Sequence, residues 1–364
     1  MARVRHKLVR SLQFLLLPLS VIPLVWVGPK ILESHHLFDR RHNSGPLPAP
    51  VVSLNAWQKQ RFQPVAPYTG VAPVLSYGEI SDDPKAGPLA VTRREFAQQM
   101  AALHWMGFRT ITVDQYLRMR AGDVRGLPPR PILITFDGGR LDSYRGAHRV
   151  LQREGFHAAM FVVSDQVRRQ NPDFLMWKEL HSMAKSHVWE IEPYAAKGYA
   201  RIAFDARGHM APFYAVRRFT RSGGLEPFAD YAQRVTLDVF AARDALHDQG
   251  FRPRAFAVPG GDYGQLATND PRIAPFMRDL LTREFGAFFT RNARNAPEYA
   301  GHDVEAQRYV VGRTTSTDRL YMWLRDHSPA AEAAAARAAA AAKAARAKKP
   351  APKHHRPSRR HRRQ

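Results

Sequence analysis

A short apolar run that ends in an acid constrains the fold of this chain more than any other feature. Ile132–Phe136 has the pattern of a buried strand, and Asp137–Gly139 follows it directly. A helical pattern at Ser143–Glu154 and a second apolar run at Ala158–Val163 come next. Strand, turn, helix and strand in this order predict a parallel α/β unit, in which ligands bind at the carboxyl ends of the strands. Asp137 is therefore the first candidate for a functional side chain.

The same alternation of apolar runs and helical patterns continues over residues 72–328 and predicts one large domain. Strands are expected at 72–76, 109–113, 132–136, 158–163, 187–191, 254–258, 287–290 and 309–312. This order is typical of a β/α barrel or of an open parallel sheet. The chain has no cysteine, so disulfides, thiolate metal sites and a thiol nucleophile are excluded.

The amino-terminal segment 1–33 combines a basic flank with a charge-free apolar run. Residues 11–29 contain no charged side chain and reach the lower end of the length that spans a bilayer. No small-x-small cleavage pattern follows, so we expect an uncleaved transmembrane helix, with a cleaved signal peptide as the alternative. The basic flank would stay in the cytoplasm, which places the main domain outside the cell membrane.

Two further segments lack the pattern of a folded core. Residues 34–71 are rich in His, Pro, Asn and Arg and are interpreted as a linker. Residues 329–364 begin as an Ala-rich helix and end in a Pro/Lys/Arg/His-rich stretch that is expected to be disordered. This tail holds much of the net charge of +23 and could bind anionic wall polymers or lipid head groups. A solvated tail without a partner is the other interpretation, and no specific nucleic acid is expected.

Four stretches within residues 72–320 resemble the polysaccharide deacetylase family, also called the NodB-homology family. These stretches are Pro73–Ile80, Phe96–Leu117, Ile134–Gly139 and Ala255–Tyr263. The resemblance implies a distorted seven-stranded (β/α) barrel, here preceded by the transmembrane helix. It also implies a metal-dependent hydrolase that removes acetyl groups from N-acetylated sugar polymers, so that the expected partner is a cell-surface polysaccharide or peptidoglycan.

The same resemblance assigns roles to single positions and shows where this chain departs from the pattern. In the family, one Asp is the general base, and a second Asp and two His hold a divalent metal. Asp137 matches the base, but Gly138 stands at the second Asp and Tyr194 at the first His. Gly198 or its neighbour Tyr199 stands near the second His. A zinc site needs about three protein ligands, so we expect no cofactor unless an unrecognised site holds zinc.

Histidines elsewhere are weak substitutes for the missing ligands. His181 precedes a predicted strand and His187 stands at its beginning, whereas His209 follows an irregular segment and could reach the site. His302 is the nearest match to the late general acid of the family. Histidines in such positions are more often surface residues than metal ligands.

Other residues could complete a site at the strand ends. Glu192 is expected to face Asp137, and Asp262 is a third acid in the same layer, so these three are the candidate catalytic residues. The glycines after Pro259, Gly260 among them, could offer backbone N–H groups to an oxyanion or a sugar hydroxyl. The candidate substrate-binding residues are Tyr194, Pro259, Gly260 and Tyr263. The alternative is that the acids only bond to nearby loops and arginines.

Three functions are compatible with this pattern. The first is a deacetylase-like domain that has lost its metal chemistry and binds glycan or assists a partner enzyme. The second is an active hydrolase, either a deacetylase with an unusual site or a metal-free glycosidase that uses Asp137 and Glu192. The third is a polyanion-binding surface protein that acts through its basic tail. A fold does not decide among them, so the site must.

Overall fold

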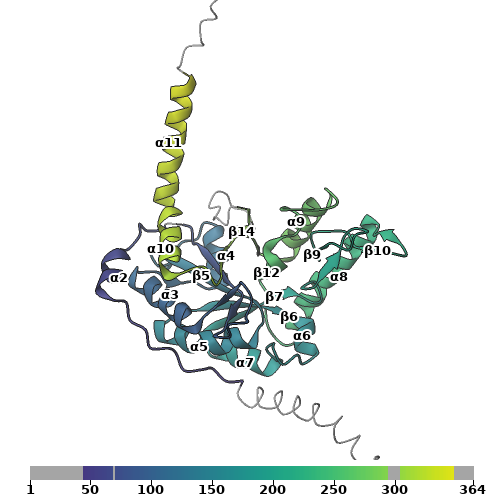
Figure 1. Ribbon diagram of the computed structural model, residues 1–364, viewed down its shortest axis with the longest axis horizontal. Coiled ribbons are helices and arrows are strands. Elements are labelled where there is room, and N and C mark those ends of the chain that lie inside the picture. Colours follow the sequence, from purple (N-terminus) through teal and green to yellow (C-terminus); the bar gives the residue numbers. More distant parts are fainter. Residues whose placement is uncertain (1–43, 69, 294–303, 348–364) are drawn as a thin grey trace, which may run out of the picture.

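The computed structural model describes residues 44–68, 70–293 and 304–347, which form an α/β fold with parallel sheets, as predicted (Figure 1). The strands are β1 (Val74–Tyr77), β2 (Glu79–Ile80), β3 (Ala90–Val91), β4 (Arg109–Thr110), β5 (Pro131–Gly138), β6 (Ala158–Val163), β7 (Trp189–Ala195), β8 (Arg201–Ala203), β9 (Met210–Pro212), β10 (Phe219–Thr220), β11 (Gly224–Leu225), β12 (Ala255–Ala257), β13 (Ala287–Thr290), β14 (Glu305–Gln307) and β15 (Tyr309–Val311).

The helices alternate with these strands along the chain. They are α2 (Ala56–Arg61), α3 (Arg93–Trp105), α4 (Val113–Arg120), α5 (Leu141–Glu154), α6 (Ser164–Arg168), α7 (Trp177–Lys185), α8 (Phe228–His247), the short 3-10 helix η1 (Pro259–Gly261), α9 (Ile273–Glu284), α10 (Thr317–Asp326) and α11 (Pro329–Ala347). Local sequence explains several of the ends: the Thr92 hydroxyl caps α3, and Gly155, with a φ of 67°, ends α5.

Two parallel sheets surround one interior. The larger has the order β15-β1-β5-β6-β7, with β4 paired to β5, and the smaller has the order β12-β13-β14. Only Arg308 separates β14 from β15, so the chain passes there from the second sheet to the first. Leu133, Phe161, Ala257 and Phe289 from both sheets share one buried cluster, so apolar side chains fill the interior between the two sheets.

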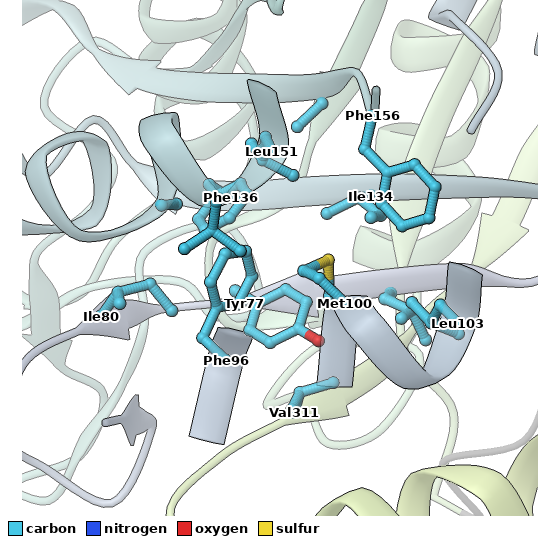
Figure 2. Close-up of a cluster of buried hydrophobic side chains, with 14 of the residues drawn as sticks. Tyr77, Ile80, Phe96, Met100, Leu103, Ile134, Phe136, Leu151, Phe156 and Val311 are labelled. Atoms are coloured by element: carbon cyan, nitrogen blue, oxygen red, sulfur yellow. The ribbon is translucent and has the colours of Figure 1, made fainter. Parts of the chain in front are cut away.

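The outer face of the larger sheet is covered by α3 and α5. Figure 2 shows the contact, where Phe96 and Met100 of α3 lie against Tyr77 of β1 and Phe136 of β5. The rings of Tyr77 and Phe136 are 5.4 Å apart between centroids, and that of Phe96 meets Tyr77 edge-on at 5.1 Å. This packing fixes the strands whose carboxyl ends carry the candidate site.

The described part of the predicted linker packs onto the domain, so residues 44–68 are not a free spacer. The side chains of Phe62 and Tyr68 are fully buried, and the Tyr68 hydroxyl donates a hydrogen bond of 2.6 Å to the carbonyl of Leu324. The apolar residues of this segment have no helical or strand period, which is why their burial was not predicted from the pattern.

The carboxyl-terminal helix α11 stands away from the body of the molecule (Figure 1). It confirms the helical half of the expected tail, whereas residues 348–364 lie outside the described part of the chain, as do the predicted anchor at 11–29 and the rest of residues 1–43. Among the residues that the structure describes, no helix is both long and apolar enough to cross a bilayer.

Candidate functional site

A cavity of about 520 Å³ opens where the parallel strands end, at the position predicted for a ligand site. Its walls come from the carboxyl ends of β1, β5, β7 and β13, from η1 and from the crossing between β14 and β15, so residues far apart in sequence meet there. The lining residues are Ser76, Gly78, Glu79, Gly87, Pro88, Leu89, Asp137, Arg140, Tyr194, Tyr199, Gly260, Gly261, Thr290, Arg291, Arg308 and Val310.

Asp137 lies in this cavity and forms a two-pronged ion pair with Arg308. Nη1 of Arg308 donates to Oδ1 of Asp137 at 2.6 Å, and Nη2 donates to Oδ2 at 2.9 Å. The Ser76 hydroxyl donates to the same Oδ2 at 3.0 Å. Both carboxylate oxygens therefore already accept charged or neutral hydrogen bonds, and this geometry is the strongest that an arginine offers a carboxylate.

Arg308 was not among the residues predicted from the sequence, yet it is the principal partner in the site. Its side chain is only 3% exposed, and its backbone N–H donates to the carbonyl of Thr290 at the crossing from β14 to β15. Nη1 also contacts the Thr135 hydroxyl at 3.2 Å. The sequence feature that could have indicated this role is the position of Arg308 directly before an apolar strand. An arginine buried there needs an acidic partner.

The residues at the three positions expected to hold metal ligands have structural roles in this fold. Gly138 has a φ of +94°, and Tyr194 is buried with its hydroxyl accepting a 3.0 Å hydrogen bond from the N–H of Gly260. A Cβ on Gly198 would lie 2.6 Å from the Tyr214 ring and 2.8 Å from an Asp238 oxygen. Asp238 in turn accepts hydrogen bonds from the N–H groups of residues 196–198, so this turn is built around glycine.

The donor set at Asp137 therefore does not fit a divalent metal. A guanidinium faces the only carboxylate that matches the family motif, and its charge opposes a second cation at close range. Within residues 44–68, 70–293 and 304–347, no cluster of three or more His, Cys, Asp or Glu side chains could hold an ion. We derive no metal-assisted step for this site.

The described histidines that were considered as substitutes do not line the cavity. His181 stacks on Phe251 at 4.9 Å between ring centroids, and His187 has a φ of 57° at the turn before β7. His209 is exposed, with Nδ1 2.6 Å from Oδ2 of Asp205. His302 lies outside the described residues.

Glu192 is buried, but the structure does not bring it to the cavity with Asp137. Its Oε2 accepts hydrogen bonds from the backbone N–H groups of Arg254 (2.8 Å) and Ala255 (3.0 Å). Burial raises the pKa of Glu192 to about 8, although the two backbone donors oppose the increase. The carboxyl group thus joins β7 to the beginning of β12, where the two sheets meet.

Of the other candidate residues, which lie in or next to η1, only one lines the cavity. Asp262 is buried and accepts hydrogen bonds from the N–H groups of Gly264 and Leu266, and the Tyr263 hydroxyl donates to Glu305 at 2.9 Å. Neither residue lines the cavity, nor does Pro259, whereas Gly260 does.

The expectation that the glycine N–H groups are free is wrong. That of Gly260 donates to Tyr194, and that of Gly261 donates to the carbonyl of Val258. Neither group is therefore available to an oxyanion or a sugar hydroxyl. The 3-10 turn that places these residues uses both N–H groups within the fold, which a glycine pattern cannot reveal.

A second charged cluster lies at the cavity wall beside Gly138. Nη2 of Arg140 is 3.1 Å from Oδ2 of Asp142 and 3.8 Å from Oε1 of Glu79. Burial and the adjacent Asp142 raise the pKa of Glu79. This cluster was not predicted, because its members belong to β2 and α5, far apart along the chain.

Comparison with known proteins shows which family this chain resembles. The family model described as polysaccharide deacetylase matches residues 125–276. This match, together with relatives that are named as deacetylases, confirms the resemblance to the polysaccharide deacetylase family that was inferred from the sequence.

Two named relatives match parts of the chain. The poly-beta-1,6-N-acetyl-D-glucosamine N-deacetylase of Escherichia coli K12 is 22% identical over 197 residues, which is 50% of this chain and 29% of that protein. YxkH of Bacillus subtilis, named as a polysaccharide deacetylase, is 33% identical over 116 residues, 32% of this chain and 39% of its own length. The chain thus spans less than half the length of each.

Solved structures share the fold across most of the chain. The de-N-acetylase of Aggregatibacter actinomycetemcomitans has a TM-score of 0.61 and 17% identity, and the match covers 70% of this chain and 99% of that one. The BpsB deacetylase domain of Bordetella bronchiseptica has a TM-score of 0.55 and 22% identity, with 67% and 97% covered. At these identities the likeness shows the fold alone.

Proposed function

We propose that this protein is a polysaccharide deacetylase-like protein that binds cell-surface glycan through the strand-end cavity and has lost metal-dependent N-deacetylation. The observation that carries the proposal is the two-pronged pair of Asp137 and Arg308. It joins the carboxylate that would serve as general base to a fixed guanidinium, while glycine and tyrosine occupy the ligand positions.

The cavity keeps properties that suit a sugar after the loss of the metal ligands. Tyr199 is 47% exposed and presents an aromatic surface, and its ring centroid is 6.2 Å from that of Tyr194. The volume of about 520 Å³ falls in the range of ordinary small-molecule sites. These features support binding independently of catalysis.

The test combines metal content, acetate release and glycan binding on the full chain. We expect no stoichiometric metal after dialysis against zinc, no chelator-sensitive acetate release from N-acetylated polysaccharide, and saturable binding that Tyr199→Ala weakens. Trp57→Ala is the matched control, since Trp57 is an exposed aromatic residue of α2 outside the cavity lining. Stoichiometric zinc together with acetate release that ceases on chelation would refute the proposal.

We also infer that residues 11–29 anchor the protein and hold this domain outside the cell membrane, as a distorted barrel of the NodB type. The support is the uncharged run behind a basic flank. Membrane fractionation of the full chain and of a chain lacking residues 1–33 tests this. Equal recovery of both in the soluble fraction would contradict it.

A further inference from the structure

Arg291 differs from the other two arginines of the cavity in having no acidic partner among the described residues. Arg308 is paired with Asp137, and Arg140 lies between two carboxylates. Within the described part of the chain, the Arg291 guanidinium makes one hydrogen bond, from Nε to the carbonyl of Gly260 at 2.7 Å. Neither of its Nη groups donates to a described residue, so both keep their donors for a ligand.

The turn at Gly261 supports the Arg291 side chain, and this support is called its seat below. Gly261 has a φ of +68°, and a Cβ there would lie 2.6 Å from Cγ of Arg291, so only glycine lets the arginine stem lie on this turn. The backbone N–H of Arg291 donates to the carbonyl of Gly261 at 3.1 Å. The Gln265 amide donates to the carbonyls of both Gly261 and Arg291, at 2.7 and 3.1 Å.

This seat fixes the position of the charge before a ligand arrives. The Pro-Gly-Gly turn, which was expected to offer free N–H groups, instead supports an arginine. A positioned side chain loses less conformational entropy on binding than a freely rotating one. An arginine so placed is suited to carboxylate or phosphate oxygens, which its planar fork can bind with two hydrogen bonds.

The remaining walls offer surface for the body of a sugar ring. Tyr199 and Leu89 are both exposed, at 47% and 50%, and both line the cavity, as does Val310. An uncompensated cation beside aromatic and aliphatic surface predicts a ligand that carries an anion on an otherwise neutral ring.

We propose that the cavity recognises an acidic sugar unit, one bearing a carboxylate or a phosphate, and that Arg291 binds the anionic group. This inference rests on the proposed glycan binding and adds the charge class of the ligand. It makes Arg291 a residue that sets specificity, whereas Asp137 and Arg308 hold each other within the site.

The experiment measures affinities of the full chain for three oligosaccharides of equal length. These are a neutral N-acetylglucosamine oligomer, a hexuronate oligomer and an oligomer bearing phosphate. We expect at least one acidic oligomer to bind about tenfold more tightly than the neutral one, the size of one hydrogen bond to a charged group. Which acidic oligomer binds better distinguishes carboxylate from phosphate.

Matched variants separate this site from the general positive charge of the chain. Arg291→Gln should remove the preference for the acidic oligomer, and Arg291→Lys should keep part of it, since lysine keeps the charge and loses the fork. Arg283→Gln removes an equivalent charge from the exposed face of α9, outside the cavity, and should leave the preference intact.

The outcomes distinguish failure of this inference from failure of the proposed function. Equal binding of neutral and acidic oligomers, or equal losses in Arg291→Gln and Arg283→Gln, would overturn the role of Arg291 while glycan binding stands. Absence of binding to every oligosaccharide would overturn both.

Discussion

Two carboxyl groups lie on strands of the larger sheet that are separated by one strand, and their partners differ in kind. Asp137 at the end of β5 faces the Arg308 guanidinium, while Glu192 in β7 faces only two backbone N–H groups. Burial raises the pKa of Glu192 to about 8, and neither of its two hydrogen-bond donors is a charged group. The first carboxylate shapes a cavity, and the second joins two sheets.

The comparison shows why burial and strand position alone do not identify a catalytic acid. Both residues were candidates because they occupy parallel strands that end at the same edge. The partner decides the role of each: Asp137 has a charged partner in the cavity, whereas Glu192 has neutral backbone donors where the two sheets meet. Mutations that remove one partner at a time test this difference.

Replacing the charged side chain of Arg308 by an uncharged one should have the largest effect on stability. Arg308→Met leaves the Asp137 carboxylate, only 16% exposed, without its counter-charge. We expect the free energy of unfolding to fall by about 3–5 kcal/mol, the usual cost of breaking a buried ion pair from one side. Urea denaturation of the full chain, followed by tryptophan fluorescence, measures this change.

The double variant Asp137→Asn/Arg308→Met is the control for the first prediction. It removes both charges, so it should recover part of the stability lost in the single variant. A loss below about 1 kcal/mol in Arg308→Met, in the range of an exposed pair, would show that the buried pair does not hold the site together.

Glu192→Gln should change how stability depends on pH. Because the folded protein holds the Glu192 proton up to about pH 8, stability from this group is complete below the unfolded pKa of 4.5 and is lost as pH rises from 4.5 to about 8. A tenfold difference in proton affinity between the folded and unfolded states corresponds to about 1.4 kcal/mol. The glutamine variant cannot ionise, so its unfolding free energy should decline less over this window.

Urea denaturation of both proteins at intervals from about pH 5 to about pH 9 covers the pH range in which this proton is lost. Subtracting the two curves removes the contribution of groups that titrate in both. Parallel curves would mean that the folded protein does not hold this proton above its ordinary pKa, and the contrast with Asp137 would then have to be abandoned.

The turn at Gly198 should be sensitive to a single methyl group. Gly198→Ala places a Cβ against Tyr214 and Asp238, so overpacking should cost about 1–3 kcal/mol. Gly45→Ala is the control, since nothing lies within 4 Å of a Cβ there. Equal thermal midpoints for the two variants would show that the 196–198 turn can accommodate a Cβ without overpacking.

The positions of several strands along the chain could be predicted, because apolar runs indicate burial directly. The β6 and β13 boundaries agree with the prediction, and Asp137 lies at a cavity as expected. The partners could not be predicted, because Arg308 and Asp137 are 171 residues apart and only the folded arrangement of the sheets brings them together. The hydrogen bonds of Glu192 to the beginning of β12 also join segments that are far apart in the sequence. They could not be foreseen, so the position of Glu192 in its strand suggested a catalytic role.

The smallest expected effect comes from the side chain of Arg254, whose backbone N–H holds Glu192. Its guanidinium is 3.1 Å from Oδ1 of Asp114, but the two side chains are 56% and 49% exposed. Arg254→Gln keeps the backbone donor and removes only this surface pair, so the free energy of unfolding should change by less than about 1 kcal/mol. Urea denaturation at low and high salt checks both the size and the screening of the effect. A loss approaching that of Arg308→Met would contradict the distinction between buried and exposed partners on which the comparison of the two carboxylates depends.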